Sequence, residues 1–244
     1  MTKAAIILAG GKGIRTGLEI PKQFVEIDGK LLIEYSIDNF SKYVDFITIV
    51  CHRDYLDYAK NIASKYKNIN ISYTTGGDTR QLSVRNGLLE LAGKNVKYVA
   101  IHDSARPLFS AELVSKLFDL VKTKKAVIPV ISVSSTIANV VNQKVYKYIK
   151  RDECFLVQTP QVFEYELIAE AHNYFYNQKI FDFTDDSQML FSLGWEIYTI
   201  EGSEINIKIT TRNDLEFAKL ILKNLYNFQF LKEKFYERTT TKGV

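Results

Sequence analysis

Short runs of β-branched and other apolar residues alternate along this chain with longer stretches in which apolar residues recur every three or four positions. The short runs predict buried strands, and the periodic stretches predict amphipathic helices. The predicted strands are Ala4–Leu8, Phe46–Cys51, Ile69–Thr74, Tyr98–His102, Ala126–Val133 and Glu196–Ile200. The predicted helices are Leu31–Phe40, Tyr55–Lys65, Leu82–Leu91, Ala111–Lys122, Tyr165–Tyr176, Asp185–Ser192 and Asn213–Asn227. This alternation is typical of an α/β fold with a Rossmann-like, mostly parallel sheet flanked by helices.

Helix starts can be predicted more finely from the polar residues at these boundaries. Ser110 and Thr184 are expected to cap the helices that follow them, because a hydroxyl can accept a hydrogen bond from an unpaired backbone N–H. The last helix is expected to begin at Arg212 or Asn213. We find no linker, so residues 1–228 are expected to form a single domain followed by a C-terminal tail, 229–244.

Residues 134–152 interrupt the alternation. They are predicted to form two short strands around Asn142 and Gln143. An isolated hairpin is marginally stable unless it packs on another surface. This hairpin could be an inserted arm that grips a second subunit, or a flap over a site on its own chain.

Composition and charge narrow the class of protein. The 244 residues suffice for one large α/β domain with a substantial core. The net charge of +4 is spread over the chain, which argues against nucleic acid as a partner. No apolar stretch has the length of a membrane span or a signal-peptide core, so neither a membrane partner nor export is expected. Cys51 and Cys154 are expected to be reduced thiols in a cytoplasmic protein.

A glycine-rich segment follows the first predicted strand. Gly10, Gly11 and Gly13 lie within four residues, and Arg15 and Lys22 follow them. Glycines let the backbone approach a bulky ligand closely because they carry no Cβ. Backbone N–H groups together with two cations are typical of a polyphosphate site. Taken alone, the segment could also be a turn with two solvated cations.

Charged residues also follow three other predicted strands, in the segments 76–80, 102–107 and 206–211. Singly, each segment could be a turn, a structural ion pair or a solvated charge. In a doubly wound sheet, however, ligands bind beyond the carboxyl ends of the strands. Five cations are therefore expected at one crevice: Arg15, Lys22, Arg80, Arg106 and Lys208. Such charges repel one another unless an anion lies among them, as a nucleoside triphosphate and a phosphorylated substrate would. Asp103 would then be a site for Mg²⁺.

These segments belong to a series of blocks that runs from Ile6 to about Ala218. The blocks are the glycine segment with Arg15 and Pro21-Lys22-Gln23, Gly76-Gly77-Asp78-x-Arg80 with Ser83-Val84, His102-Asp103-x-x-Arg106-Pro107, Gln158-Thr159-Pro160-Gln161-x-Phe163, Thr184-Asp185, and Asn206-x-Lys208-x-Thr210. In these blocks the chain resembles the sugar-nucleotidyltransferase-like cytidylyltransferases. It is most similar to the group of 2-C-methyl-D-erythritol 4-phosphate cytidylyltransferase and ribitol-5-phosphate cytidylyltransferase.

The resemblance implies a role for each matching residue. The nucleotide would be bound by Ala9, Gly10, Gly11, Gly13, Gly77, Asp78, Arg80, Ser83 and Ala105. The second substrate would be bound by Asp103, Arg106, Thr136, Arg151, Thr159, Thr184 and Thr210, with Asp103 also beside the metal. Catalysis would rest on Arg15, Lys22 and Lys208. Thr136 and Arg151 match positions on a dimer arm that reach the neighbouring subunit's substrate, which implies a homodimer.

The implied reaction is transfer of CMP from CTP to a small polyol phosphate, with Mg²⁺ and release of pyrophosphate. Ala9-Gly10-Gly11 and Asp103-Ser104 are similar to the ribitol-phosphate branch, and Ser135 stands where both branches usually place Asp. The segments 183–186 and 201–210 are more similar to the methylerythritol branch. We therefore favour methylerythritol phosphate, in isoprenoid precursor synthesis. Ribitol 5-phosphate, for CDP-ribitol and a cell-surface polymer, stays open.

Two hypotheses of other classes are less favoured. A non-catalytic nucleotide-binding module would not need the cations around the α-phosphate, such as Lys22 and Lys208. A dinucleotide-dependent oxidoreductase is disfavoured, because the glycine segment lacks the G-x-G-x-x-G spacing.

Overall fold

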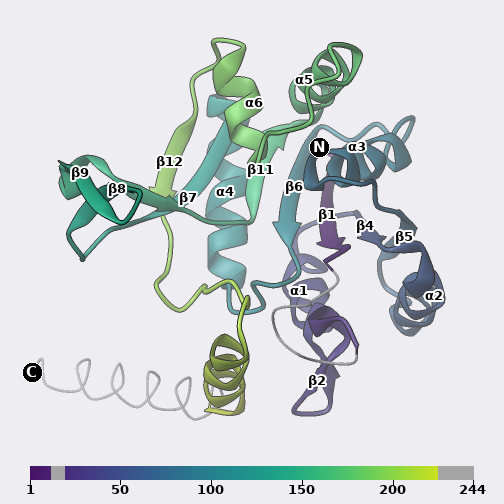
Figure 1. The fold of residues 1–244 in the computed structure, drawn as a ribbon. Helices are drawn as coiled ribbons and strands as arrows, with labels where there is room; N and C mark the ends of the chain where they lie inside the picture. The colour runs from purple at the N-terminus through teal and green to yellow at the C-terminus, as the bar shows by residue number, and fades with distance from the viewer. Residues whose placement is uncertain (12–19, 225–244) are drawn as a thin grey trace, which may run out of the picture.

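The computed structural model describes residues 1–11 and 20–224. Within these residues, eight strands form one sheet with helices on both faces (Figure 1). The strands are β1 (Lys3–Ala9), β4 (Phe46–Cys51), β5 (Asn70–Thr75), β6 (Tyr98–Asp103), β7 (Ala126–Ser132), β10 (Phe155–Val157), β11 (Gln161–Glu164) and β12 (Tyr198–Glu201). Their order is β10-β7-β11-β6-β1-β4-β5, and β12 also pairs with β7. Since only β10 and β11 run antiparallel to their neighbours among these pairs, the predicted α/β fold with a mostly parallel sheet is confirmed.

Helices cover the two faces of the sheet in two groups. They are α1 (Leu32–Phe40), α2 (Leu56–Lys65), α3 (Arg80–Glu90), α4 (Ala111–Lys124), α5 (Tyr165–Asn177) and α6 (Asp186–Ser192). Successive side chains of a strand point to opposite faces. On β1, Ala5 and Ile7 therefore pack with α1, α2 and α4, whereas Ala4 and Ile6 pack with α3, α5 and α6.

The carboxyl ends of four parallel strands meet at one edge of the sheet. In the register of β1, Ala9 lies beside Cys51 of β4, and Leu8 lies beside Asp103 of β6. Cys51 in turn lies beside Thr75 of β5. The segments that leave these strands therefore start side by side, and they carry most of the predicted site.

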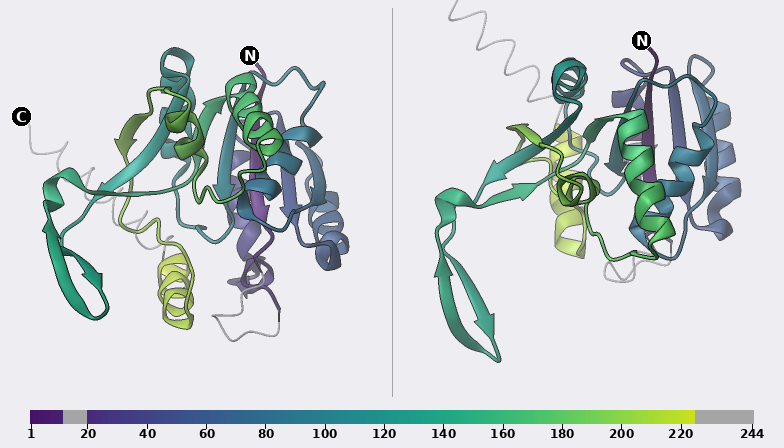
Figure 2. Two further views of the ribbon diagram at one scale, coloured as in Figure 1. Left: turned by 45° about the horizontal axis from the view of Figure 1, so that its top comes forward. Right: turned by 90° about the horizontal axis from the view of Figure 1, so that it is seen from above.

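The predicted hairpin in residues 134–152 is confirmed. It consists of β8 (Ile137–Val141) and β9 (Lys144–Ile149), which pair with each other and not with the main sheet. Both views in Figure 2 show it standing away from the body of the molecule. Its side chains are largely exposed, including the apolar rings of Tyr146 and Tyr148 at 76% and 70%. Its role as a dimer arm remains a prediction.

Several element boundaries differ from the sequence prediction. β10 and β11 are not predicted, because three and four residues are too few for an alternating pattern to stand out. The same holds for the short pair β2 (Glu26–Ile27) and β3 (Lys30–Leu31). α3 begins at Arg80, before the predicted start, because Thr79 Oγ1 accepts a hydrogen bond from the Leu82 N–H at 3.1 Å.

The predicted helix caps give a mixed outcome. Ser110 caps α4 as predicted, since its Oγ accepts from the Leu113 N–H at 3.1 Å. The prediction that Thr184 caps α6 is wrong. Asp185 is the cap, and its carboxylate accepts from the Ser187 N–H at 2.9 Å.

A last helix covers 212–224 and packs on the β2–β3 end of the molecule. It begins at Arg212, one of the two predicted starts. Its predicted end at Asn227 and the tail 229–244 lie outside the described residues. In the part of the chain that the structure describes, no helix has the length and apolar character needed to cross a membrane.

Candidate active site

Two of the molecule's pockets lie beyond the carboxyl ends of β1, β5 and β6. The first, which we call the glycine-loop pocket, has a volume of about 270 Å³. The predicted residues that line it are Gly10, Gly11, Lys22, Gly77, Asp78, Arg80, Ser83, Asp103, Ala105 and Lys208. The second, which we call the α6 pocket, has about 280 Å³. The predicted residues that line it are Arg80, Asp103, Arg106, Thr159, Thr184 and Lys208.

Arg80, Asp103 and Lys208 line both pockets, and we call them the shared wall. Asp103 is buried between the two cations. Its Oδ1 lies 3.2 Å from Arg80 Nε, and its Oδ2 lies 2.6 Å from Lys208 Nζ. Burial alone would raise the pKa of Asp103, but the charges of Arg80 and Lys208 outweigh it and hold this pKa well below its ordinary range. Asp103 is therefore a carboxylate at any physiological pH.

Lys22 enters the glycine-loop pocket from a short 3-10 turn, η2 (Lys22–Phe24). Its ammonium donates a hydrogen bond to the Ile209 carbonyl, next to Lys208. Gln23, which is buried, donates from Nε2 to the carbonyls of Ala9 at 2.5 Å and Gly11 at 3.1 Å. These contacts fix the turn against both the glycine segment and the segment that carries Lys208.

Glycine occurs at different positions of this pocket for different physical reasons. A Cβ at Gly10 or Gly11 would meet no atom within 4 Å among residues 1–11 and 20–224, so packing against these residues does not require glycine there. Both line the pocket, where a missing side chain leaves room for a ligand. At Gly77, by contrast, a Cβ would lie 2.5 Å from the Leu82 Cβ, so close packing against α3 requires glycine.

Polar groups behind β6 support the shared wall. Thr159 Oγ1 accepts from the Asp103 N–H at 3.1 Å and lies 3.1 Å from His102 Nδ1. The other ring nitrogen of His102 lies 3.2 Å from Ser36 Oγ on α1. Burial lowers the pKa of His102 to about 3, so the ring is neutral at physiological pH. This neutral chain fixes the backbone of Asp103 without adding charge to the site.

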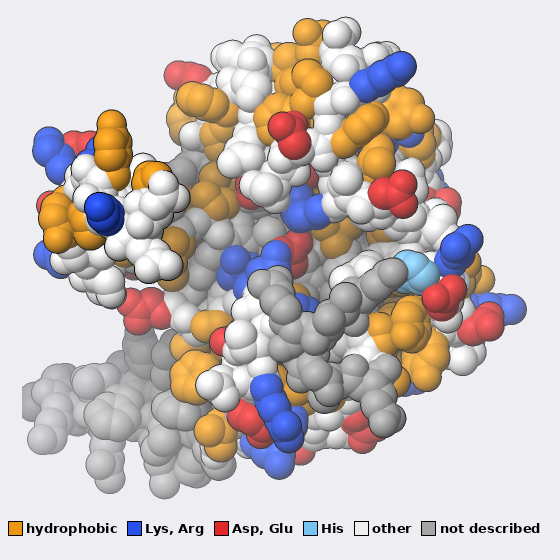
Figure 3. Space-filling view, in the orientation of Figure 1, with side chains coloured by type: hydrophobic (Ala, Val, Ile, Leu, Met, Phe, Trp, Pro, Cys, Tyr) orange, Lys and Arg blue, Asp and Glu red, His pale blue; other side chains and the backbone are white. Residues whose placement is uncertain are grey.

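Positive charge gathers at the hollow in the middle of the face shown in Figure 3, with carboxylates among it. Repulsion among cations led us to expect an anionic ligand there. In the structure, Asp103 pairs with Arg80 and Lys208, and Asp186 pairs with Arg80 at 2.7 Å. The protein's own carboxylates thus relieve part of this repulsion.

Comparison with known proteins decides between the families that such a site could serve. A family model described as 2-C-methyl-D-erythritol 4-phosphate cytidylyltransferase matches residues 3–224. The chain belongs to this cytidylyltransferase family. A relative of that name from Caldicellulosiruptor bescii is 39% identical over 228 residues, which cover 93% of this chain and 100% of the relative. A relative of the same name from Bacteroides fragilis is 37% identical and covers 91% of this chain and 100% of its own length.

The fold comparison agrees with the sequence comparison. The crystal structure of 4-diphosphocytidyl-2C-methyl-D-erythritol synthase from Anaerococcus prevotii matches with a TM-score of 0.79 at 32% identity, covering 91% of this chain and 98% of that one. The predicted family and a CTP-dependent nucleotidyltransferase are confirmed. The ribitol-phosphate alternative is not favoured, since these relatives carry the methylerythritol name.

Some residues to which the cytidylyltransferase resemblance assigns a role do not line either pocket. Ala9 is buried at the end of β1. Thr136 and Arg151 lie at the base of the hairpin, where Arg151 Nη1 donates to the Ser134 carbonyl at 3.0 Å. Thr210 Oγ1 donates to Asp214 at 2.7 Å, at the start of the last helix. Gly13 and Arg15 lie outside the described residues.

Three buried polar residues also shape this cytidylyltransferase site, although the family motifs gave them no role. They are Gln23, His102 and Asp186. Gln23 adjoins Lys22, and His102 adjoins Asp103, so their neighbours in the sequence were the signal. Nothing local marks Asp186, because its partner Arg80 is 106 residues away.

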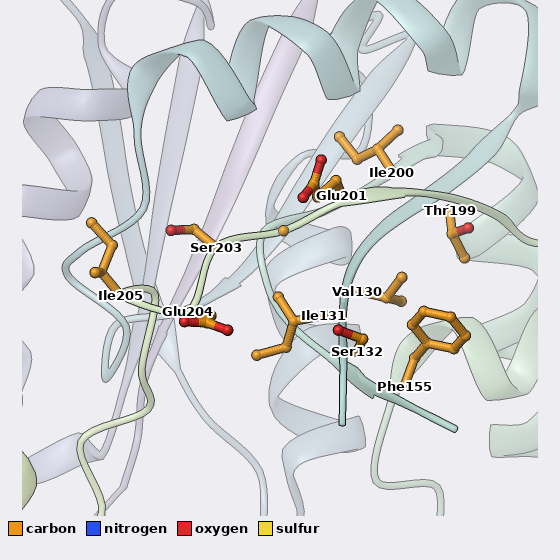
Figure 4. Close-up of a pocket in the computed structure, with 11 residues that line it drawn as sticks. Val130, Ile131, Ser132, Phe155, Thr199, Ile200, Glu201, Ser203, Glu204 and Ile205 are labelled. Carbon is orange, nitrogen blue, oxygen red and sulfur yellow. The ribbon is translucent and has the colours of Figure 1, made fainter. Parts of the chain in front are cut away.

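A larger cleft, of about 700 Å³, shares no lining residue with either pocket (Figure 4). It is bordered by β7, β10 and β12 and by the segment after β12. Among the described residues that line it there is no Lys or Arg, and its charged side chains are Glu201 and Glu204. A cleft with two carboxylates and no cation is unsuited to a triphosphate, so its greater volume does not make it the nucleotide site.

Proposed function

We propose that this protein transfers CMP from CTP to the phosphate of 2-C-methyl-D-erythritol 4-phosphate and releases pyrophosphate, in isoprenoid precursor synthesis. One observation carries the proposal beyond family membership: two pockets meet at Arg80, Asp103 and Lys208. A transfer between two phosphorylated substrates requires two adjacent sites with charge at their boundary. CTP would occupy the glycine-loop pocket, and the acceptor would occupy the α6 pocket.

The proposed reaction is a direct displacement. An acceptor phosphate oxygen bonds to the α-phosphorus of CTP, the bond from that phosphorus to the bridging oxygen breaks, and pyrophosphate leaves with the electron pair. No side chain has to form a covalent intermediate. The protein's task is to position the phosphates and stabilise the charge that develops on their oxygens. We assign this task to Lys22 and Lys208, and to Arg15 by family resemblance.

The remaining proposed contacts are assigned according to the pocket that each residue lines. Gly10 and Gly11 would face the triphosphate, and Gly77, Asp78, Arg80, Ser83 and Ala105 would surround the cytidine. In the α6 pocket, Arg106, Thr159 and Thr184 would bind the acceptor. Arg106 is already fixed, since its Nη1 donates to the Asn206 carbonyl at 2.8 Å.

We propose that Mg²⁺ binds together with the CTP phosphates, beside Asp103. No group of three His, Cys, Asp or Glu side chains suited to a metal is found in residues 1–11 and 20–224. Asp103 offers one carboxylate whose two oxygens are already in ion pairs. This donor set fits a metal held mainly by phosphate oxygens, as Mg²⁺ commonly is at nucleotide sites. Bound there, Mg²⁺ would offset negative charge on the triphosphate.

We further propose that the active unit is a cytoplasmic homodimer in which residues 134–152 reach the other subunit. Exposed apolar side chains on the hairpin support this, because such surface is usually covered by a partner. Thr136 and Arg151 would then contact the acceptor bound to the partner. The cytoplasmic assignment is supported by Cys51 and Cys154, which are free thiols.

The test is pyrophosphate release from CTP and Mg²⁺ with each candidate acceptor in parallel. We expect turnover with 2-C-methyl-D-erythritol 4-phosphate and little with ribitol 5-phosphate. ATP, GTP and UTP should be poor substitutes for CTP, because a wrong base leaves buried polar groups unpaired. Faster turnover with ribitol 5-phosphate would refute the acceptor. CTP binding without turnover of either acceptor would indicate a non-catalytic nucleotide-binding module.

A further inference from the structure

A histidine and an aspartate lie buried behind the shared wall. His172 is on α5 and Asp186 is the first residue of α6, and each side chain is 1% exposed. His172 Nε2 lies 3.1 Å from Asp186 Oδ1. Because a carboxylate can only accept, Nε2 carries a proton and donates it to this hydrogen bond. Nδ1 of the same ring is buried and has no hydrogen-bond partner in the described residues. The one polar interaction shown for the ring is therefore with Asp186.

Asp186 forms an ion pair with Arg80. Its second oxygen, Oδ2, accepts from Arg80 Nη1 at 2.7 Å, while Arg80 Nε faces Asp103 at 3.2 Å. Burial alone would raise the pKa of Asp186, but Arg80 and His172 outweigh it and lower this pKa. The half-buried guanidinium of Arg80, whose side chain is 23% exposed, is thus fixed between two carboxylates at separate edges of its planar fork.

The contacts continue from Arg80 to the lysine of the shared wall. Asp103 uses one oxygen for Arg80 and the other for Lys208. His172, Asp186, Arg80, Asp103 and Lys208 therefore form one chain of charged or polar contacts that joins α5, α6, α3, β6 and the segment after β12. His172 and Asp186 do not line either pocket, so any effect on bound phosphates has to pass through Arg80.

We propose that Asp186, oriented by His172, is a positioning residue for phosphate transfer. This inference rests on the proposed function. Arg80 has many rotamers, and without Asp186 its guanidinium would be free to turn one edge onto both oxygens of Asp103 and compete with Lys208. Asp186 keeps one edge occupied, so Asp103 retains an oxygen for Lys208. The charges of the shared wall are then in place before the substrates bind, which is the arrangement that lowers a barrier most.

The primary test is Asp186→Asn, which keeps the shape of the side chain and removes its charge. We expect kcat to fall on the order of ten- to a hundredfold, as for a misplacement of groups at the reacting centre. KM for CTP should rise by a smaller factor than kcat falls, because Arg80 is only one of several residues that line the glycine-loop pocket. Asp186→Glu, which retains a carboxylate, should recover part of kcat, and His172→Gln should lower kcat less than Asp186→Asn.

A matched control separates positioning from stability. Glu34 is a buried carboxylate on α1 that accepts from Lys65 at 2.8 Å and from the Leu31 N–H at 2.8 Å, outside both pockets. Glu34→Gln should lower the melting temperature and leave kcat unchanged. If Asp186→Asn loses activity only in proportion to its loss of folded protein, as this control would, the inference is overturned.

A second measurement reports on the position of Arg80 and does not depend on turnover. The Nη1–H NMR signals of Arg80, assigned by their loss in Arg80→Lys, should be protected from solvent exchange in the parent protein, where Asp186 accepts from Nη1, and lose that protection in Asp186→Asn. An active parent whose Asp186→Asn variant keeps both its kcat and this protection would overturn the inference alone. An inactive parent would instead refute the proposed function, whatever the NMR signal shows.

Discussion

Lys22 joins two parts of the site that are far apart in the sequence. It leaves the glycine-loop side of the pocket, and its ammonium donates to the Ile209 carbonyl beside Lys208. A cation fixed there can stabilise charge on phosphate oxygens without moving first. We expect Lys22→Ala to lower kcat on the order of a hundredfold, with a smaller effect on KM for CTP. Steady-state kinetics with CTP as the varied substrate measure both constants.

Lys30→Ala is a matched control for Lys22→Ala. Lys30 pairs with Asp38 at 2.7 Å, and both side chains are substantially exposed and outside the two pockets. Its kinetics should equal those of the parent, since an exposed ion pair contributes little. If Lys22→Ala weakens CTP binding and keeps the parent's kcat, Lys22 binds the ground state and has no special role in the transition state.

His102 makes the protein's stability depend on pH. Its pKa is about 3 in the folded protein, against 6.5 when unfolded. Between pH 3 and pH 6.5, His102 therefore binds a proton in the unfolded chain but not in the folded protein. This contribution is fully present above pH 6.5, and it is lost by up to about 1.4 kcal/mol per pH unit as the pH falls toward 3. Urea unfolding of the parent and of His102→Gln at several pH values should show a shallower acid dependence in the variant.

An NMR titration gives an independent check on His102. Its ring carbon shifts should stay those of a neutral imidazole at pH 5, where an ordinary histidine is protonated. Protonation of the ring near pH 6.5 in the folded protein would contradict the prediction, as would parallel stability curves for the parent and His102→Gln.

Site residues differ in how well the sequence predicts them. Asp103 and Lys208 are charged residues at strand ends, where parallel sheets bind ligands, and they do line both pockets. Asp186 has no such signal, because its importance lies in a contact with Arg80 that only the folded chain creates. Thr210 shows the reverse: it stands in a family motif, yet its hydroxyl bonds to Asp214 at a helix start.

At the level of elements, the start of the last helix is fixed by a reciprocal cap. Asp214 accepts from the Thr211 N–H at 2.7 Å, and Thr211 Oγ1 accepts from the Asp214 N–H at 3.2 Å. Asp214→Ala removes one half of this capping box and should lower the free energy of unfolding by about 1 kcal/mol. Urea unfolding at pH 7 measures this difference.

The same cap has a predictable acid dependence. Burial would raise the pKa of Asp214, but hydrogen bonds from Thr210 and Thr211 outweigh it and lower this pKa to about 2, against an ordinary 3.8. A depressed carboxylate pKa stabilises the fold above 3.8, and this is lost as the pH falls through 2. The stability difference between the parent and Asp214→Ala should therefore shrink below about pH 4.

Glu216→Ala, which removes an exposed carboxylate on the same helix, is the control. An equal loss in both variants would show that the capping box does not stabilise this helix.

Long periodic elements were predicted well and short ones poorly. The strands around β1 and helices such as α4 repeat their apolar pattern often enough to be recognised. β10 and β11 have three and four residues, and their pairing with β7 and β6 comes from tertiary contacts. β10 follows the hairpin in the sequence and β11 lies between β7 and β6, so without these two strands the sequence prediction does not define how the hairpin joins the sheet.

At the level of the whole molecule, apolar side chains are exposed on the hairpin and at its base. Val140, Val145 and Tyr146 on the hairpin are more than half exposed, as is Phe155 at its base. The cleft of about 700 Å³ lies at the same end of the sheet and is lined in part by Phe155 (Figure 4). An exposed apolar hairpin beside a cleft that Phe155 lines supports the proposed dimer, because each copy would offer both halves of a self-complementary contact.

If the hairpin completes the partner's site, two inactive chains should restore activity together. Arg151→Ala damages the arm, and Lys22→Ala damages the body of the site. In a mixed dimer, one site combines the intact Lys22 of the first chain with the intact Arg151 of the second. Each heterodimer should therefore regain about half of the parent activity, from one working site in two. Co-refolding differently tagged chains and assaying the purified heterodimer tests this. Heterodimers that form and stay inactive would show that Arg151 serves its own chain or has no part in catalysis.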